Sequence, residues 1–274
     1  MGGHGIVRWD SRLRPERAPV SPRHADEASR TDRSSRRIPL AGTLNLRDVG
    51  GYPTSDGGTV RWRTLLRSDA LHRLDDSGRA ALAGFGLRTV VDLRTDEEAE
   101  NAPSGLHGTG ARLFHVPLIR AEAIGTLPPE LAAVYRHMID DRGAAIAEAV
   151  GRLSADGALP GLIHCSAGKD RTGLVAALVL EVIGVPDEII AADYALSAEN
   201  LDADTAQVIS QIQAISGGHR LDLGVLGSPP ELILATLARA RDQAGSVAAY
   251  LIRHGLPQPA IDSLRGALVV PPLP

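Results

Sequence analysis

The residues best suited to chemistry lie in one ten-residue segment, HCSAGKDRTG at residues 164–173, which holds the only cysteine and the only lysine of the chain. Cys165 supplies a nucleophilic sulfur. Arg171, six residues later, carries a planar guanidinium that can bind two phosphoryl oxygens at once, as a lysine could not. The apolar residues after Gly173 predict a helix, whose N-terminal N–H groups attract an anion. The segment therefore predicts a loop that binds a phosphoryl group and attacks it.

Such a loop would act by covalent catalysis. Its positive field favours the thiolate of Cys165, which would attack phosphorus in line and form a cysteinyl-phosphate for water to hydrolyse. Arg171 and the loop amides would stabilise the charge on the equatorial oxygens. This chemistry needs neither a metal nor another cofactor. The remaining residues expected at the phosphate site are Ser166, Ala167, Gly168, Lys169, Thr172 and Gly173.

Two other interpretations of the segment are weaker. A Walker loop requires glycine at position 163 and a hydroxyl residue at position 170, where Ile163 and Asp170 stand. A free cysteine is most often a small buried hydrophobe, but polar and glycine residues surround Cys165 in the sequence. The nucleophile remains the better interpretation.

The elements that must position this loop follow an alternating pattern. Buried strands are expected at 65–68, 87–93, 112–117 and 162–164, and the Asp-Gly turn at 56–57 predicts a hairpin. The expected helices are 75–83, 129–141, 143–154, 173–183, 186–196, 199–215, 229–244, 246–254 and 258–266.

This order predicts an α/β fold: a mainly parallel central sheet flanked by helices, with a largely helical C-terminal part. The strand at 162–164 runs directly into the cysteine loop. Because ligands bind at the carboxyl ends of strands in such sheets, the loop lies where a site is expected.

The composition of the chain excludes several classes of protein. The chain has 274 residues and a net charge of −4, which gives no indication of a nucleic-acid partner. A single cysteine excludes an internal disulfide framework and a cysteine-based zinc cluster. The apolar stretch 174–185 is too short to cross a bilayer, and residues 1–37 hold no apolar run of signal-peptide length. We therefore expect a cytoplasmic protein without stable membrane insertion.

Residues 1–37 differ in composition from the rest. They contain nine arginines and five acids, and they show no apolar periodicity. This composition predicts a disordered basic tail, followed by a single domain at 38–274.

The motifs resemble those of a known family. The segment at 164–173, together with NLRDVGG at 45–51, is similar to the PtpB-type tyrosine and dual-specificity phosphatases of bacteria, a branch of the protein tyrosine phosphatase superfamily. Shorter matches are RSD at 67–69, VDLR at 91–94, ADY at 192–194 and GVLG at 224–227. The resemblance implies a protein-tyrosine phosphatase with Cys165 as the nucleophile and Arg171 as the phosphate-binding residue.

The resemblance also implies a range of substrates. Members of the group accept phosphotyrosine, phosphoserine or phosphothreonine, and inositol phospholipids to varying degrees. Lys169 and Asp170 match positions found in phosphoinositide phosphatases, so Lys169 either meets an extra phosphate or simply strengthens the field of the loop. We expect phosphoprotein or inositol-phospholipid substrates. A phosphoinositide phosphatase is the main alternative, and a non-catalytic module that binds phosphorylated ligands is a weaker one.

The general acid is left open between two aspartates. A tyrosyl leaving group has a pKa near 10 and must be protonated as it departs. The chain lacks the Trp-Pro-Asp loop of eukaryotic-type tyrosine phosphatases. Asp92 is the first candidate because it ends a strand on the same sheet edge as the loop, and Asp170 within the loop is the second.

The other polar residues of the motifs are expected to support the site. Asn45, Arg47 and Asp48 would brace it, and His164 would orient the loop rather than transfer protons. The acids at 96–98 are expected to begin a helix, where negative charge is favourable. The helical region 197–227 is a candidate lid, with simple helical packing as the alternative.

Overall fold

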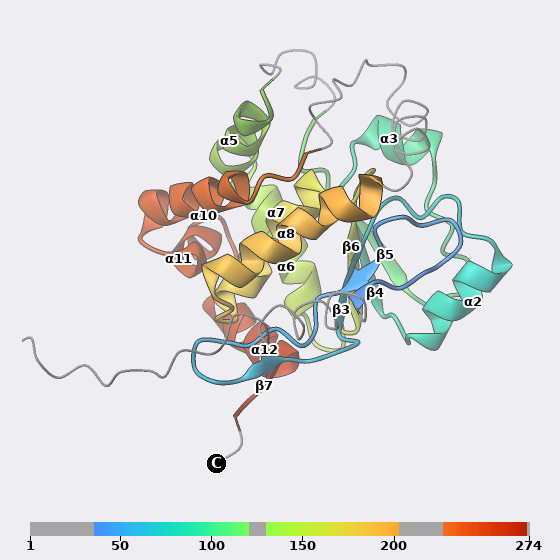
Figure 1. Ribbon diagram of the computed structural model, residues 1–274, viewed down its shortest axis with the longest axis horizontal. Coiled ribbons are helices and arrows are strands. Elements are labelled where there is room, and N and C mark those ends of the chain that lie inside the picture. Colours follow the sequence, from blue (N-terminus) through green and yellow to red (C-terminus); the bar gives the residue numbers. More distant parts are fainter. Residues whose placement is uncertain (1–35, 121–129, 203–226, 273–274) are drawn as a thin grey trace, which may run out of the picture. The chain divides into compact units, whose positions relative to one another are not determined.

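The central element of the fold is a five-stranded sheet. The computed structural model describes residues 36–120, 130–202 and 227–272 (Figure 1), so the tail up to residue 35 and most of the candidate lid lie outside the described residues. Four strands run parallel, and the first runs antiparallel at one edge. The strand order is β1 (Arg47–Asp48), β3 (Leu65–Ser68), β6 (Gly161–His164), β4 (Thr89–Asp92) and β5 (Arg112–His115). The predicted mainly parallel sheet is confirmed.

The register of the sheet places three carboxyl ends side by side. His164 at the end of central β6 lies opposite Ser68 of β3 and Asp92 of β4. The residues that follow these strands therefore meet at one edge, which is where the cysteine loop begins.

Helices cover both faces of this sheet, as alternating side chains require. Leu66, Leu162 and Val90 pack in one cluster with Leu82 of α2, whereas Ile163 and its neighbours on the other face pack with the later helices. Figure 1 shows the two groups on opposite sides of the strands. The helices are α2 (Asp76–Gly84), α3 (Asp96–Asn101), α5 (Leu131–Asp141), α6 (Gly143–Ser154), α7 (Asp170–Val182), α8 (Asp187–Asp202), α10 (Pro230–Ala244), α11 (Val247–Arg253) and α12 (Gln258–Leu268).

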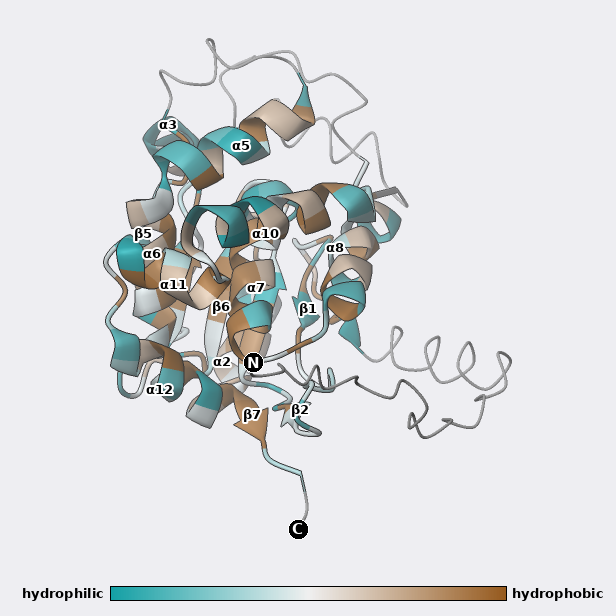
Figure 2. Ribbon diagram, turned by 90° about the vertical axis from the view of Figure 1, so that its left-hand side faces the viewer, coloured by the Kyte–Doolittle hydropathy of each residue, from teal (hydrophilic) through white to brown (hydrophobic). Residues whose placement is uncertain are grey.

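Helix α7 forms the centre of the helical layer. Every residue from Thr172 to Leu180 is buried, and the helix is hydrophobic along most of its length (Figure 2). A helix that is apolar all round must be enclosed by other elements, and α8, α10, α11 and α6 contact it. The loop before α7 is thus attached to the most deeply packed helix of the domain.

One expectation about the helices needs correction, and the expected hairpin has an additional strand partner. The helices expected at 186–196 and 199–215 are continuous as α8 through Asp202, because no glycine or proline interrupts the chain there; residues 203–215 lie outside the described part. The expected hairpin forms: the Val60 N–H donates to the Tyr52 oxygen at 2.7 Å, the Gly51 N–H donates to the Val60 oxygen at 2.6 Å, and Pro53 pairs with Thr59. Strand β2 (Thr59–Val60) also pairs antiparallel with β7 (Val269–Val270), a contact that the local pattern does not indicate.

Ordered contacts begin slightly before the predicted domain boundary. The buried Arg36 guanidinium lies 3.6 Å from the centre of the Tyr52 ring and 4.9 Å from that of Trp62.

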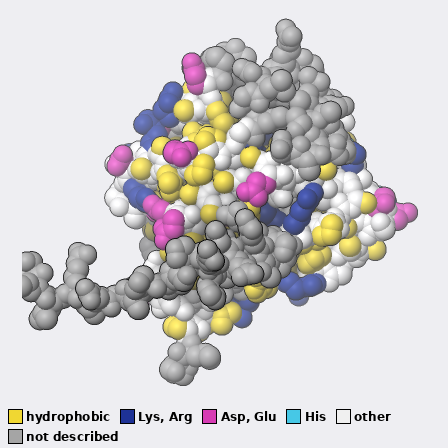
Figure 3. Space-filling view, viewed as in Figure 1, with side chains coloured by type: hydrophobic (Ala, Val, Ile, Leu, Met, Phe, Trp, Pro, Cys, Tyr) yellow, Lys and Arg dark blue, Asp and Glu magenta, His cyan; other side chains and the backbone are white. Residues whose placement is uncertain are grey.

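Acidic and basic side chains are interspersed over the described part of the face in Figure 3. Among the helices of the described ranges, none is long and apolar enough to cross a membrane.

Candidate active site

The predicted loop connects the central strand to the central helix. Cys165 follows β6 directly and is only 2% exposed, and α7 begins at Asp170. Gly168 has a φ of +68°, and a Cβ there would lie 2.5 Å from the Ser68 carbonyl and from the Asp69 nitrogen. Only glycine allows this close approach. The end of β3 therefore fixes the path of the loop.

The carbonyl groups of the loop are bound from outside by two side chains. Asn45 Nδ2 donates to the oxygens of Ala167, at 3.0 Å, and Gly168, at 3.1 Å. Arg67 Nη2 donates to the oxygens of Gly168, at 3.0 Å, and Lys169, at 3.4 Å. In a trans peptide the N–H points away from the preceding C=O. The amides that follow these carbonyls therefore face away from Asn45 and Arg67, as an anion-binding loop requires.

A buried carboxylate holds the two arginines that support this arrangement. Asp193 of α8 accepts bonds from Arg47 Nε at 3.2 Å, Arg67 Nη1 at 2.5 Å and the Tyr52 hydroxyl at 3.0 Å. Burial alone would raise the pKa of Asp193, but the two arginines outweigh it and lower the pKa to about 2. Asp193 is therefore ionised, and Ser197 Oγ accepts further bonds from both arginines.

Asp69 supports Asn45 from the other side. Its carboxylate accepts the backbone N–H groups of Leu44, at 3.0 Å, and Asn45, at 2.9 Å. Burial raises the pKa of Asp69 to about 6 despite these bonds. Asp48 instead accepts from the N–H groups of Gly50 and Arg63. Asn45 thus contacts the loop itself, and Arg47 supports it by donating to both Asn45 and Asp193. Asp48 shapes the following turn.

The sequence analysis missed the partner of Arg171. Glu98 of α3 accepts both Nη groups, one of them at 2.9 Å, and also accepts the Ser166 hydroxyl. Burial would raise the pKa of the Glu98 carboxyl, but Arg171 lowers it to about 2. Burial would likewise lower the pKa of Arg171, but Glu98 keeps it above its ordinary value. The guanidinium is therefore held in one orientation beside the loop.

The sequence around Glu98 indicates a different role for its carboxylate. The Thr95-x-x-Glu98 spacing is that of a capping box, and the structure shows both of its hydrogen bonds. The acids at 96–98 begin helix α3 as expected. Nothing in the local pattern indicates that the same carboxylate also reaches Arg171.

Asp92, the first candidate for the acid, is occupied by another ion pair. Arg94 donates to it through Nε, at 2.9 Å to one oxygen, and through Nη2, at 2.6 Å to the other, and Ser104 Oγ lies 3.3 Å away. Burial would raise the pKa of Asp92, but His164 and Arg94 hold it well below its usual range. This environment favours the ionised carboxylate, which has no proton to donate.

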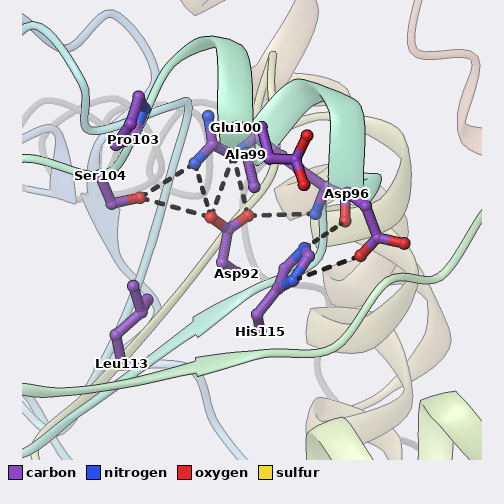
Figure 4. Close-up of a pocket in the computed structure, with 9 residues that line it drawn as sticks. Asp92, Asp96, Ala99, Glu100, Pro103, Ser104, Leu113 and His115 are labelled. Carbon is purple, nitrogen blue, oxygen red and sulfur yellow. Dashed lines mark hydrogen bonds and ion pairs between the residues drawn. The ribbon is translucent and has the colours of Figure 1, made fainter.

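Asp92 also lines a cavity beside α3 (Figure 4). The cavity has a volume of about 340 Å³, and its wall contains the ion pair between Asp92 and Arg94. Its lining includes neither Cys165 nor Arg171. The lining residues are Asp92, Arg94, Asp96, Ala99, Glu100, Pro103, Ser104, Leu113 and His115.

Asp170, the second candidate, lies at the start of α7 within the loop and keeps partial access to solvent, with 21% of its side chain exposed. Its Oδ1 accepts the Tyr135 hydroxyl at 3.0 Å and lies 3.3 Å from Lys169 Nζ. Lys169 is itself buried and donates to the Gly227 carbonyl at 2.7 Å. The same loop therefore contains the nucleophile, the phosphate-binding arginine and a carboxyl group.

His164 and Thr172 complete the segment. His164 is fully buried, with Nδ1 3.4 Å from the Cys165 oxygen and Nε2 3.6 Å from Asp92, and burial lowers its pKa. These contacts fit the expected role of orienting the loop. Thr172 is also fully buried, and its hydroxyl oxygen has no hydrogen-bond partner among the described residues.

Comparison with known proteins gives the same assignment as the motifs. A family model for the tyrosine phosphatase family matches residues 38–270. The triple specificity protein phosphatase PtpB of Mycobacterium tuberculosis is 32% identical over 276 residues, which span 84% of this chain and 98% of PtpB. A tyrosine-protein phosphatase of Nostoc commune is 32% identical over 73% of this chain and 72% of its own length. The solved structure of TpbA from P. aeruginosa is a weaker match, with a TM-score of 0.34 and 17% identity over 79% of this chain and 96% of TpbA. The chain belongs to the tyrosine phosphatase family.

Proposed function

We propose that this protein hydrolyses phosphotyrosine through a cysteinyl-phosphate on Cys165. The observation that carries the proposal is the geometry of the loop. Its carbonyls are bound outward by Asn45 and Arg67, and Arg171 is oriented by Glu98 beside the nucleophile. A preformed set of donors stabilises developing negative charge without reorganisation during the reaction.

In the first step the Cys165 thiolate attacks phosphorus, a P–S bond forms, and the bond to the tyrosyl oxygen breaks. Arg171 and the loop amides bind the equatorial oxygens. The departing oxygen takes a proton from a carboxylic acid of the site. In the second step water attacks phosphorus, its proton returns to the same carboxylate, and the P–S bond breaks. The products are inorganic phosphate and the regenerated thiolate.

Asp170 is the better candidate for that acid. It lies within the loop with part of its side chain exposed, and its partners are a neutral hydroxyl and an ammonium. Asp92 is held ionised by a bidentate arginine and is 2% exposed. A general acid must be within reach of the leaving group and able to hold a proton, and Asp170 meets these conditions better.

We infer a substrate range wider than phosphotyrosine. PtpB of M. tuberculosis, which matches over most of this chain, is named a triple specificity phosphatase. Lys169 lies in the loop beside Asp170, and its buried ammonium, which donates to the Gly227 carbonyl, would add positive charge to the field that a phosphoinositide meets at the loop. Selective loss of lipid hydrolysis in Lys169→Ala would support that assignment, and equal loss on phosphotyrosine peptides would make Lys169 a general cation of the loop.

The proposal is tested by assaying an aryl phosphate with EDTA present. Wild-type protein should turn over and Cys165→Ser should not, while mass spectrometry of the wild type traps a phosphate adduct on Cys165. Equal activity of Cys165→Ser, or folded wild-type protein without turnover, would refute the assignment. A panel of phosphotyrosine, phosphoserine and phosphothreonine peptides and inositol lipids then ranks the substrates.

A further inference from the structure

Two tyrosines distant in sequence form a hydrogen-bonded chain that ends on Asp170. The Tyr135 hydroxyl of α5 donates to Asp170 Oδ1 at 3.0 Å, and the Tyr194 hydroxyl of α8 lies 2.7 Å from the Tyr135 hydroxyl. A hydroxyl carries one proton, so when Tyr135 donates to Asp170 it accepts from Tyr194. Both protons in the chain are then directed toward the carboxyl group.

This chain of hydrogen bonds places the two carboxyl oxygens of Asp170 in different environments. Oδ1 accepts from Tyr135 and faces Lys169 Nζ at 3.3 Å. An oxygen that already faces two donors is a poor place for a third proton, so protonation is directed to Oδ2. We propose that Tyr135 and Tyr194 are positioning residues that anchor Oδ1 of Asp170 and so make Oδ2 the oxygen that delivers the proton. This inference rests on the proposed function, in which Asp170 is the general acid.

The two rings are rigidly held. Each tyrosine is 1% exposed, and the rings meet edge to face, with centres 6.2 Å apart and planes at 90°. A Cβ on Gly173 would lie 2.8 Å from Tyr194 Cδ2. The last glycine of the catalytic motif therefore makes room for the Tyr194 ring, which ties α8 to the first turn of α7.

The hydroxyl groups are suited to donation rather than to proton transfer. Burial raises the pKa of both tyrosines, with Asp170 contributing in the same direction, so they stay protonated. When Asp170 gives its proton to the leaving oxygen, the carboxylate that forms keeps its bond from Tyr135. Water returns a proton to Oδ2 in the second step, and neither tyrosine changes its protonation state.

The test compares two substrates that differ in their need for an acid. Phenyl phosphate has a leaving group of pKa about 10, like tyrosine, whereas the leaving group of 4-nitrophenyl phosphate departs with little protonation. The ratio kcat/KM reports the first step for each. Tyr135→Phe should lower kcat/KM for phenyl phosphate about tenfold, a part of the 10²- to 10⁴-fold that acid catalysis supplies, and should change 4-nitrophenyl phosphate less than about twofold.

Tyr194→Phe is the matched control, because it removes a hydroxyl that touches Tyr135 but not Asp170. Its effect should have the same substrate dependence and be smaller, about twofold. Asp170→Asn is the reference: once Asp170 cannot donate, adding Tyr135→Phe should cause no further loss on phenyl phosphate. This lack of additivity distinguishes positioning from a general structural effect.

An equal loss on both substrates in Tyr135→Phe, or a full additional loss in the double variant, would overturn the proposal. So would an Asp170→Asn variant whose loss is the same on both substrates. Cys165→Ser separates this failure from that of the proposed function: if it alone abolishes turnover, the phosphatase assignment stands and only the role of the tyrosines fails.

Discussion

Glu98 and Arg171 form a two-point ion pair across 73 positions of sequence, in which both guanidinium Nη groups donate to the two carboxylate oxygens. The same carboxylate accepts the hydroxyl of Ser166, the residue after the nucleophile. Helix α3 thereby fixes both the arginine and one side of the loop. The orientation of the phosphate-binding group depends on a short helix outside the motif.

Glu98→Gln should therefore weaken catalysis as well as folding. The amide keeps the shape of the carboxylate but loses the charge that orients Arg171, so we expect kcat/KM for an aryl phosphate to fall about tenfold or more, within the range for charge-assisted bonds. Glu97→Gln, on the exposed neighbouring position, is the control. Unchanged kcat/KM in Glu98→Gln would show that Arg171 is oriented without it.

Acid should destabilise the folded protein through the same carboxylate. Folding lowers the pKa of Glu98 from 4.5 to about 2, so the folded state binds fewer protons than the unfolded state between these values. The stabilisation is complete above pH 4.5 and is lost as the pH falls toward 2. The free energy of unfolding of wild type relative to Glu98→Gln, measured in urea, should thus be largest near pH 7 and shrink below pH 4.5. A difference that stays constant with pH would contradict this origin.

Asp92→Asn should affect stability rather than acid catalysis. Arg94 is fully buried, and removing its carboxylate leaves an uncompensated charge, which typically costs about 3–5 kcal/mol. Urea unfolding should show this loss, and Asp96→Asn, which changes an exposed acid of the same cavity, should not. If Asp92→Asn instead loses activity selectively on phenyl phosphate compared with 4-nitrophenyl phosphate, Asp92 is the acid after all.

Gly168→Ala should damage the site beyond the cost of its backbone conformation. Gly168 and Gly157 have nearly the same φ, +68° and +69°, but a Cβ at Gly157 meets no atom within 4 Å. Gly157→Ala thus measures the strain alone, about 1–2 kcal/mol. Gly168→Ala must also displace the end of β3, so we expect a larger loss of stability and at least a tenfold loss of kcat/KM. Equal effects of the two substitutions would mean that the loop moves freely.

Most of the fold could be predicted from the sequence because the patterns that define strands and helices are local. Apolar runs and glycine or proline punctuation predicted the four parallel strands of the sheet and most helices, but not the short antiparallel β1. The strand before Cys165 placed the loop at the carboxyl edge. The break expected between residues 196 and 199 was wrong because no glycine or proline interrupts the chain there, and Ser197 within the continuous α8 accepts hydrogen bonds from two buried arginines. The membership in the family followed from the motif itself.

The supporting side chains were harder to predict because they are distant in sequence. Glu98 and Tyr135 each carry ordinary helical signals, and their contacts with the loop depend on how α3 and α5 pack. Asp92 was correctly placed at the sheet edge, yet its environment is set by Arg94, whose side chain turns back onto it. Spacing predicts which residues share an edge, whereas charge partners decide what a carboxyl group can do there.

The pairing of β2 with β7 has a consequence for the synthesis of the protein. Arg61 binds the backbone oxygens of Ala267, Leu268 and Val269, and Thr59–Val60 pairs with Val269–Val270. An early segment of the domain therefore has pairing partners that lie more than two hundred positions later in the sequence. The hydrogen bonds between β2 and β7, and those of Arg61 to residues 267–269, can form only once the last part of the domain has been synthesised, whereas the local pairing of Val60 with Tyr52 needs no later residue.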